Sequence, residues 1–125
     1  MILVDTTVWI DHFRSPEPSL QQHLAAGQVL THSMVIGELA CGNLPRRKDT
    51  LQRLASLSRI VELDHGEVLQ QIEGRSLMGR GIGFVDTHLI CSVLNRRGAS
   101  LWTRDRRLKN IADELGVGFA EQARE

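Results

Sequence analysis

The sequence has few cysteines and no long apolar stretch. Cys41 and Cys91 are its only cysteines, and each stands among apolar residues. We therefore expect buried free thiols in a cytoplasmic protein rather than a disulfide. No apolar run approaches the roughly 18 residues that span a membrane. Asp5 interrupts the apolar N-terminus and no basic region precedes it, so we expect neither a signal peptide nor a membrane partner.

The chain also has no net charge, because its 15 basic and 15 acidic residues balance. The charges are unevenly placed, however. The window 75–109 holds eight basic residues and two acidic ones, a local net charge of +6. Such a region can bind a polyanion, or it can be a solvated helix surface, and charge alone leaves both open. The basic residues are Arg75, Arg80, Arg96, Arg97, Arg104, Arg106, Arg107 and Lys109.

Short apolar segments alternate with helical patterns along the 125 residues, which form a single domain by length. Strands are expected at 2–4, 29–32, 59–63, 100–103 and, as a short last strand, 117–119. Helices are expected at about 6–14, 19–26, 34–41, 46–58, 64–78, 85–96 and 105–115. This alternation predicts a three-layer α/β/α sandwich spanning 1–125, with a central, mainly parallel sheet of four to five strands.

Three acidic residues stand where strands end or helices begin. Asp5 follows the apolar strand 2–4, and open α/β sheets have their sites outside the carboxyl ends of the strands. Asp105 follows the strand 100–103 in the same way, and Thr103 could offer its hydroxyl to a water or to a carboxylate. Asp5, Asp86 and Asp105 could each also be an ordinary helix cap.

Glu38 does not fit the cap interpretation, because it lies inside its predicted helix. Its neighbours three and four residues away are Met34, Val35, Cys41 and Gly42, none of them basic. We expect this face to be apolar and buried. A carboxylate there is costly unless it is paired or bound to a metal.

The carboxylates of Asp5, Glu38, Asp86 and Asp105 would together form a hard oxygen donor set, which suits Mg²⁺ or Mn²⁺. Such an ion makes a hydroxide nucleophile from bound water and neutralises charge on a phosphodiester. The basic window surrounds two of the four acids, where a nucleic-acid backbone would lie. The candidate RNA contacts are Arg80, Arg104, Arg106 and Arg107.

Four fragments in this order resemble the PIN-domain family: LVDTTVWID at 3–11, SMVIGEL at 33–39, FVDTH at 84–88 and LWTRDRRL at 101–108. The resemblance covers essentially the whole chain, and the length and the opening are most similar to VapC-type toxins of bacterial toxin–antitoxin pairs. By position, it implies that Asp5, Glu38, Asp86 and Asp105 are the catalytic and metal-binding acids. It implies supporting hydroxyls at Thr103 and Thr6.

The resemblance further implies a Mg²⁺-dependent endoribonuclease, with Mn²⁺ able to substitute, that cleaves RNA and arrests translation and growth. It implies a homodimer that is neutralised by a cognate antitoxin, whose tail presents a basic residue to the acids. Asp11 is expected to be a solvent-facing helix residue. His88 is expected to be structural or RNA-facing, not a general base.

Two other functions stay open. One is a PIN nuclease of RNA maturation that is not toxic, and the neighbouring gene would separate it from a toxin. The other is a non-catalytic α/β binding module whose acids are caps, which a titration with Mn²⁺ would separate. A phosphoaspartate enzyme is disfavoured because Thr7 stands where the haloacid-dehalogenase pattern has a second Asp.

Overall fold

Four short parallel strands form the centre of the computed structural model, which describes residues 1–121. They lie in the order β3-β2-β1-β4, so β1 is an inner strand and pairs with both β2 and β4. Because all strands run the same way, their carboxyl ends meet at one edge of the sheet. The strands are β1 (Ile2–Val4), β2 (Val29–Thr31), β3 (Ser58–Arg59) and β4 (Ser100–Trp102).

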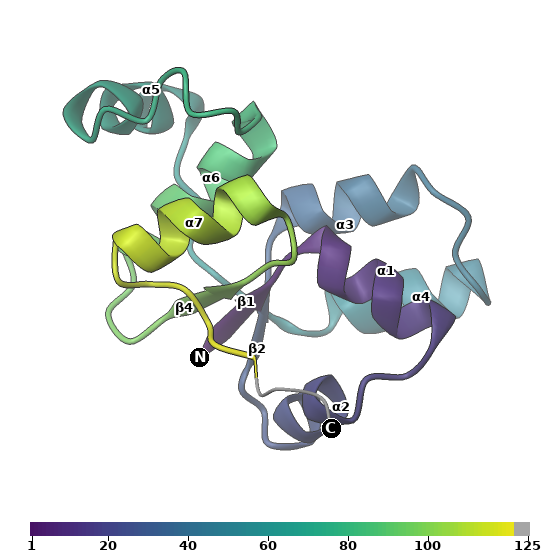
Figure 1. Cartoon of the computed structure of the whole chain (residues 1–125). Coiled ribbons are helices and arrows are strands. Elements are labelled where there is room, and N and C mark those ends of the chain that lie inside the picture. Colours follow the sequence, from purple (N-terminus) through teal and green to yellow (C-terminus); the bar gives the residue numbers. More distant parts are fainter. Residues whose placement is uncertain (122–125) are drawn as a thin grey trace.

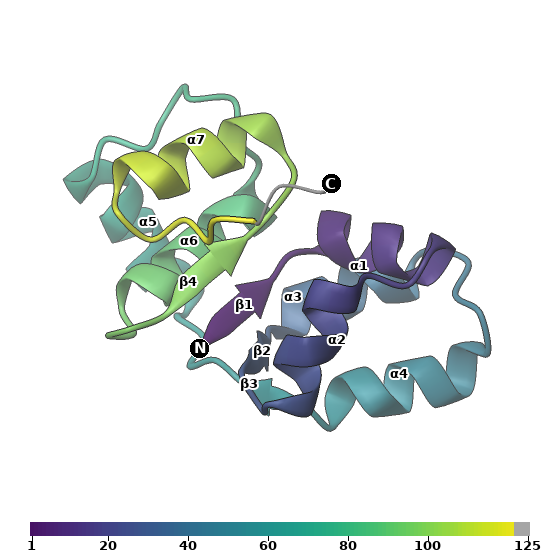
Figure 2. The ribbon, with the colours of Figure 1, turned by 60° about the horizontal axis from the view of Figure 1, so that its bottom comes forward.

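Helices cover both faces of this sheet and confirm the predicted three-layer α/β sandwich. In Figures 1 and 2, α5, α6 and α7 gather on the β4 side, and α1 to α4 gather on the other side. None of the helices among the described residues is long and apolar enough to cross a membrane. The helices are α1 (Thr6–Arg14), α2 (Pro18–Ala25), α3 (Ser33–Ala40), α4 (Arg47–Ala55), α5 (His65–Gly74), α6 (Phe84–Leu94) and α7 (Arg106–Glu114).

The core forms around β1 and α6. All three residues of β1 are buried, and so are seven consecutive residues of α6, from Thr87 to Val93. A strand buried on both faces has to be apolar throughout, which explains the run Ile2, Leu3 and Val4. Because β1 is rigidly enclosed, the residue that follows it is held in a fixed place.

Local sequence signals set several element ends. Pro18 begins α2 in the first helical position, and Gly27 follows its end with a φ of +68°. Asp64 and Glu67 form a capping box at the start of α5. His32 caps α3, because its Nδ1 accepts a hydrogen bond from the backbone N–H of Met34 at 3.1 Å.

Three predicted elements are shorter in the structure. The helix expected to reach residue 78 ends at Gly74, because Ser76 takes a φ of +54°. The strand expected at 59–63 is reduced to β3, which ends at Arg59. The chain leaves the sheet after Ile60, and Val61 is 77% exposed. The last predicted strand, 117–119, contributes one parallel bridge, between Leu101 and Gly118.

The two cysteines are free thiols, as predicted. Cys91 is buried in α6, but the prediction of burial was wrong for Cys41, which is exposed. Cys41 is the C-cap residue of α3, one position after the last helical residue. Its apolar neighbours in the sequence therefore do not enclose it.

Candidate active site

Asp5 lies at the carboxyl end of the inner strand β1 and is only 3% exposed. The hydroxyls of Thr7 and Thr103 both donate hydrogen bonds to its Oδ2, at 2.8 Å and 2.7 Å. Asp5 stands in the N-cap position of α1, yet its side chain accepts no capping hydrogen bond from the helix. The cap interpretation therefore does not account for this carboxylate.

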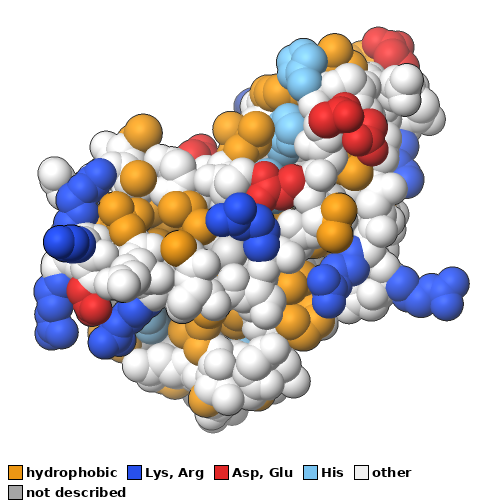
Figure 3. Space-filling model, turned by 180° about the vertical axis from the view of Figure 1, so that it is seen from behind, with side chains coloured by type: hydrophobic (Ala, Val, Ile, Leu, Met, Phe, Trp, Pro, Cys, Tyr) orange, Lys and Arg blue, Asp and Glu red, His pale blue; other side chains and the backbone are white. Residues whose placement is uncertain are grey.

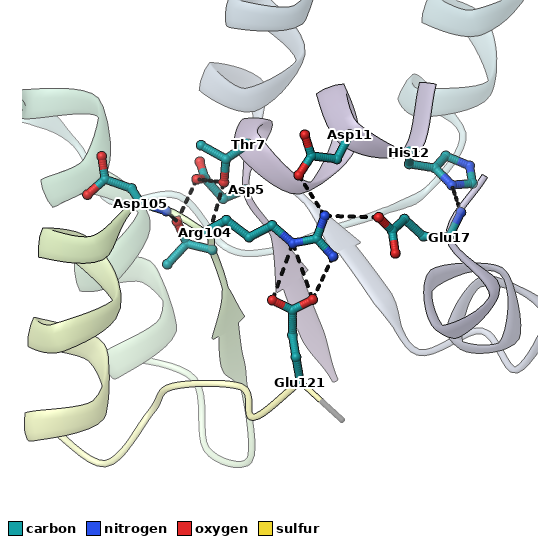
Figure 4. Close-up of polar contacts among 9 residues, drawn as sticks. Asp5, Thr7, Asp11, His12, Glu17, Arg104, Asp105 and Glu121 are labelled. Atoms are coloured by element: carbon teal, nitrogen blue, oxygen red, sulfur yellow. Dashed lines mark hydrogen bonds and ion pairs between the residues drawn. The ribbon is translucent and has the colours of Figure 1, made fainter. Parts of the chain in front are cut away.

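The ends of β1 and β4 are tied together by a small network of hydroxyls and backbone amides (Figure 4). Besides binding Asp5, Thr103 accepts a hydrogen bond from the backbone N–H of Asp105 at 3.1 Å. The backbone N–H of Arg104 donates to the Thr7 hydroxyl at 3.0 Å. The loop 103–105 is thus held against the start of α1, with Asp5 and Asp105 on either side of Thr103. Sequence reasoning missed Thr7, although a hydroxyl two residues after an acid was a signal for such a contact.

Glu38 is exposed, so the prediction that it lies on a buried face was wrong. The core-facing residues of α3 are Val35 and Leu39, four positions apart, and Glu38 lies beside that stripe. Its Oε1 accepts a hydrogen bond of 2.8 Å from the hydroxyl of Thr6. The partner that the local sequence did not supply therefore comes from α1.

Asp86 is partly buried near the start of α6, where Gly83 is the N-cap residue. Burial, and then the charges of Asp5, Asp105 and Glu38, raise the pKa of Asp86 to about 6. A backbone hydrogen bond from Gly83 acts in the opposite direction. Since three carboxylates from three other segments all act on Asp86, the fold brings the four candidate acids to one place.

Asp105 is the one candidate that does act as a cap. It is exposed, and its Oδ1 accepts a hydrogen bond from the backbone N–H of Leu108 at 3.0 Å, at the start of α7. A cap uses one oxygen of a carboxylate, so capping does not prevent the other oxygen from binding a ligand. Of Asp5, Asp86 and Asp105, only Asp105 caps a helix with its side chain.

The chemistry of this donor set fits a hydrated divalent cation. Asp5 Oδ1 has no hydrogen-bond partner within residues 1–121, and the clustered acids repel one another. In the described part of the chain, no three acidic, histidine or cysteine side chains are arranged as a ready metal cage. Mg²⁺ does not require one, because it keeps several waters and binds through one or two carboxylates and substrate phosphates.

Arg104 is the centre of an ion-pair cluster that the sequence did not predict (Figure 4). Its Nη1 donates to Asp11 at 2.7 Å and to Glu17 at 3.0 Å, and its Nη2 donates to Glu121 at 2.6 Å. The bonds to Glu121 are the main cause that raises the Arg104 pKa. Asp11 is 43% exposed but paired, so the expectation of a solvent-facing residue holds only in part. Its partner is 93 positions away, which no local pattern reveals.

Several other arginines of the basic window also have acidic or backbone partners. Arg80 forms an ion pair with Glu114, and Arg107 Nη1 lies 3.5 Å from the carbonyl oxygen of Gly81. Arg106 is exposed. Figure 3 shows a further group of Lys and Arg side chains at its left edge, which is the α4 side of Figure 1. The exposed basic residues of that segment are Arg46, Arg47, Lys48 and Arg53.

His88 is 4% exposed and packs in the core beside the site. Its ring centroid lies 4.7 Å from that of Phe84 and 6.2 Å from that of His32. Burial lowers the pKa of His88. Of the two alternatives left open for this residue, the structural one agrees with its position.

Two comparisons show which known proteins the chain is similar to. The sequence profile of the PIN domain matches residues 2–114. The chain is also similar to the protein named Ribonuclease VapC32 in two strains of Mycobacterium tuberculosis, CDC 1551 / Oshkosh and ATCC 25618 / H37Rv. In both cases 45% of residues are identical over 122 residues, which are 98% of this chain and 98% of the relative. All four candidate acids lie inside the matched regions.

Proposed function

The chain belongs to the PIN-domain family, and on this basis we propose that it is an endoribonuclease that acts as the toxin of a toxin–antitoxin pair. The observation that carries the proposal is the convergence of four carboxylates, seen in the effect of Asp5, Glu38 and Asp105 on the pKa of Asp86. The similarity to Ribonuclease VapC32 over nearly the whole chain supports the same reaction and the same biological role.

We assign the binding of Mg²⁺ to Asp5, Glu38, Asp86 and Asp105, with Mn²⁺ as a substitute. When bound, the ion would activate a water and stabilise the charge that develops on the phosphodiester. Thr103 and Thr7 orient the Asp5 carboxylate, and Thr6 orients Glu38. Each hydroxyl leaves one carboxylate oxygen of its partner for a ligand. Near pH 6 and below, Asp86 keeps a proton that an ordinary aspartate has lost, and metal binding there would release it.

We assign the contacts to the RNA backbone to the exposed Arg106 and Arg107. Arg80, which belongs to the same basic window, is a third candidate. Arg107 already lies against the loop that contains Gly81, beside the N-terminus of α6. Arg104 was also a predicted RNA contact, and its three acidic partners favour a role in holding the loop 103–105. Phosphate contacts of this kind make RNA affinity fall as salt rises.

The toxin role brings further proposals. The chain forms a homodimer in the cytoplasm, and a cognate antitoxin neutralises it. Its cleavage of RNA arrests translation and growth. The nuclease of RNA maturation remains the alternative within the family, and the two differ in whether expression of the chain without a partner stops growth.

The test combines growth with cleavage. Expression of the wild type should stop growth, and the purified chain should cut RNA with Mg²⁺ or Mn²⁺ but not with EDTA. Asp5→Asn and Glu38→Gln should remove both effects, whereas Asp49→Asn, which removes an exposed acid of α4, should keep both. Cleavage without toxicity would favour RNA maturation. Cleavage that persists in both site variants would contradict the assignment of the acids.

A further inference from the structure

A groove opens beside Glu38, between α1 and the segment that follows α3. It has a volume of about 640 Å³, and Glu38 itself forms part of its wall. We call it the Glu38 groove. Because Glu38 belongs to both, the groove lies directly beside the candidate active site. The lining residues that matter for the argument are Ile10, Phe13 and Leu44, which are apolar, and Arg14, Asn43 and Glu38, which are polar.

The polar groups of the Glu38 groove are available for a ligand. Arg14 and Asn43 are both exposed, and within residues 1–121 neither side chain has a hydrogen-bond or ion-pair partner. The apolar wall is open as well, since Ile10 is 40% exposed. A cation, an amide and an apolar surface thus meet beside a carboxylate of the candidate site without any internal contact that explains them.

A second groove makes a useful contrast. It has a volume of about 500 Å³, lies between α1, α2 and α4, and is lined by Trp9 and Leu54 among others. None of the four candidate acids lines it, and its Arg53 is already paired with Asp49 at 3.1 Å. The Glu38 groove is therefore the one that continues the candidate active site.

The chemistry of the Glu38 groove suits one nucleotide of single-stranded RNA. Such RNA is recognised when an unstacked base packs on aromatic or apolar side chains and hydrogen-bonds through its edge. A free anion is a poor occupant because Glu38 is part of the wall. A nucleotide suits the groove if its base, which is uncharged, enters it and its phosphate meets Arg14.

We propose that the Glu38 groove is a subsite that binds the nucleotide next to the scissile phosphate, with Arg14 contacting its phosphate and Asn43 reading the edge of its base. The inference rests on the proposed ribonuclease function. It assigns part of the sequence preference of cleavage to Asn43, which offers both a donor and an acceptor. It assigns part of the substrate affinity to Arg14.

The test uses the full chain with Mn²⁺. Cut sites in total RNA are mapped first, and a fluorescein-labelled single-stranded RNA with the mapped sequence then serves in steady-state cleavage. Arg14→Ala should raise KM about tenfold with little change in kcat, as for a lost hydrogen bond to a charged group. It should also reduce the salt slope of log(kcat/KM) by about 0.7, the value for one phosphate on a single strand. Arg14→Lys should restore most of the KM.

Asn43→Ala should flatten the base preference at one position beside the cut. Arg53→Ala is the matched control, since it removes an exposed arginine from the other groove and should change neither KM nor base preference. The melting temperatures of the variants should stay close to that of the wild type, because the replaced side chains are exposed and make no internal contacts that the structure shows, apart from the surface pair of Arg53.

The failures can be told apart. If the wild type cuts RNA, and Arg14→Ala and Asn43→Ala match it in KM, salt slope and base preference, the subsite is wrong and the nuclease stands. If those variants cut normally but a co-expressed antitoxin no longer restores growth, the groove binds protein and the proposal is overturned. A wild type that cuts no RNA would remove the proposed function, and this inference with it.

Discussion

The hydroxyl of Thr103 donates a hydrogen bond of 2.7 Å to Oδ2 of Asp5, although 98 positions separate the two residues. Both residues are 3% exposed, so the bond is shielded from water. It exists because β4 lies directly beside β1, with Trp102 paired to Val4. β1 and β4, the first and the last strand in the sequence, thus build the candidate site together.

Replacing Thr103 by Val keeps the shape of the side chain and removes the hydroxyl. The buried Asp5 carboxylate then loses one of its two hydroxyl donors, which should reduce stability by about 1 to 3 kcal/mol and reduce RNA cleavage. Thr103→Ser should restore both. Urea unfolding and a cleavage assay would measure the two effects.

Thr31 provides the matched control for that substitution. It is also a buried threonine at the end of a strand, but within residues 1–121 its hydroxyl has no hydrogen-bond partner. Thr31→Val should therefore be neutral or stabilising. Equal losses in Thr31→Val and Thr103→Val would show that the bond to Asp5 contributes nothing specific.

The raised pKa of Asp86 predicts a pH dependence of stability in the metal-free protein. The unfolded chain releases this proton near its ordinary value of 3.8, and the folded chain releases it near about 6. Between these values the folded state binds more protons, so the contribution of Asp86 to stability falls as pH rises through the window. Asp86→Asn should therefore be more stable than the wild type at pH 7, by about 1 to 2 kcal/mol because Asp86 is only partly buried.

The difference between Asp86→Asn and the wild type should shrink toward pH 4, where the folded wild type is protonated and the unfolded chain begins to take up the proton. Thermal unfolding across pH 4 to 7 would measure it. Saturating Mg²⁺ should stabilise the wild type at pH 7 and flatten its pH dependence. A difference that stays constant over the whole range would contradict the clustering of the four acids.

Divalent metal should stabilise the fold through the acids. A ligand that binds only the native state at a hundredfold excess over its Kd adds about 2.7 kcal/mol. Millimolar Mn²⁺ should therefore raise the melting temperature of the wild type clearly. The shift should be lost in Asp5→Asn and kept in Asp49→Asn. No shift in the wild type would favour the non-catalytic binding module.

Removal of Arg104 should leave mutually repelling acids next to the site. Arg104→Met keeps most of the side-chain length but leaves Asp11, Glu17 and Glu121 without their shared cation. Since Arg104 is only 19% exposed, we expect a loss of about 2 kcal/mol or more in urea unfolding. Cleavage should fall as well, because the ion pairs of the Arg104 side chain hold the loop 103–105, whose backbone N–H at residue 104 is bonded to Thr7.

Arg80→Met is the comparison for the Arg104 substitution. It breaks a more exposed ion pair, with Glu114, and should lose about 1 kcal/mol or less. If the two substitutions reduce the free energy of unfolding equally, the cluster around Arg104 is no more than a set of surface ion pairs.

Much of the fold could be predicted from the sequence because its signals are local. The apolar run of β1, the capping box of α5 and the prolines and glycines around α2 each act within a few residues. Predictions that depended on the surroundings were less successful. Glu38 and Cys41 stand among apolar neighbours in the sequence, yet both are exposed. Neighbours along a helix do not determine which side of it meets the core.

The sequence by itself determined the alternation of strands and helices, the places of Asp5, Asp86 and Asp105 at or near element ends, and the place of Glu38 inside a helix. The tertiary structure alone decided which groups hold these acids: Thr103 and Thr7 on Asp5, and Thr6 on Glu38. It also decided that Arg104 joins three acids from distant segments. The physical reason is that periodicity and capping act over a few residues, whereas these contacts depend on the order of the strands in the sheet. That order places the ends of β1 and β4 side by side.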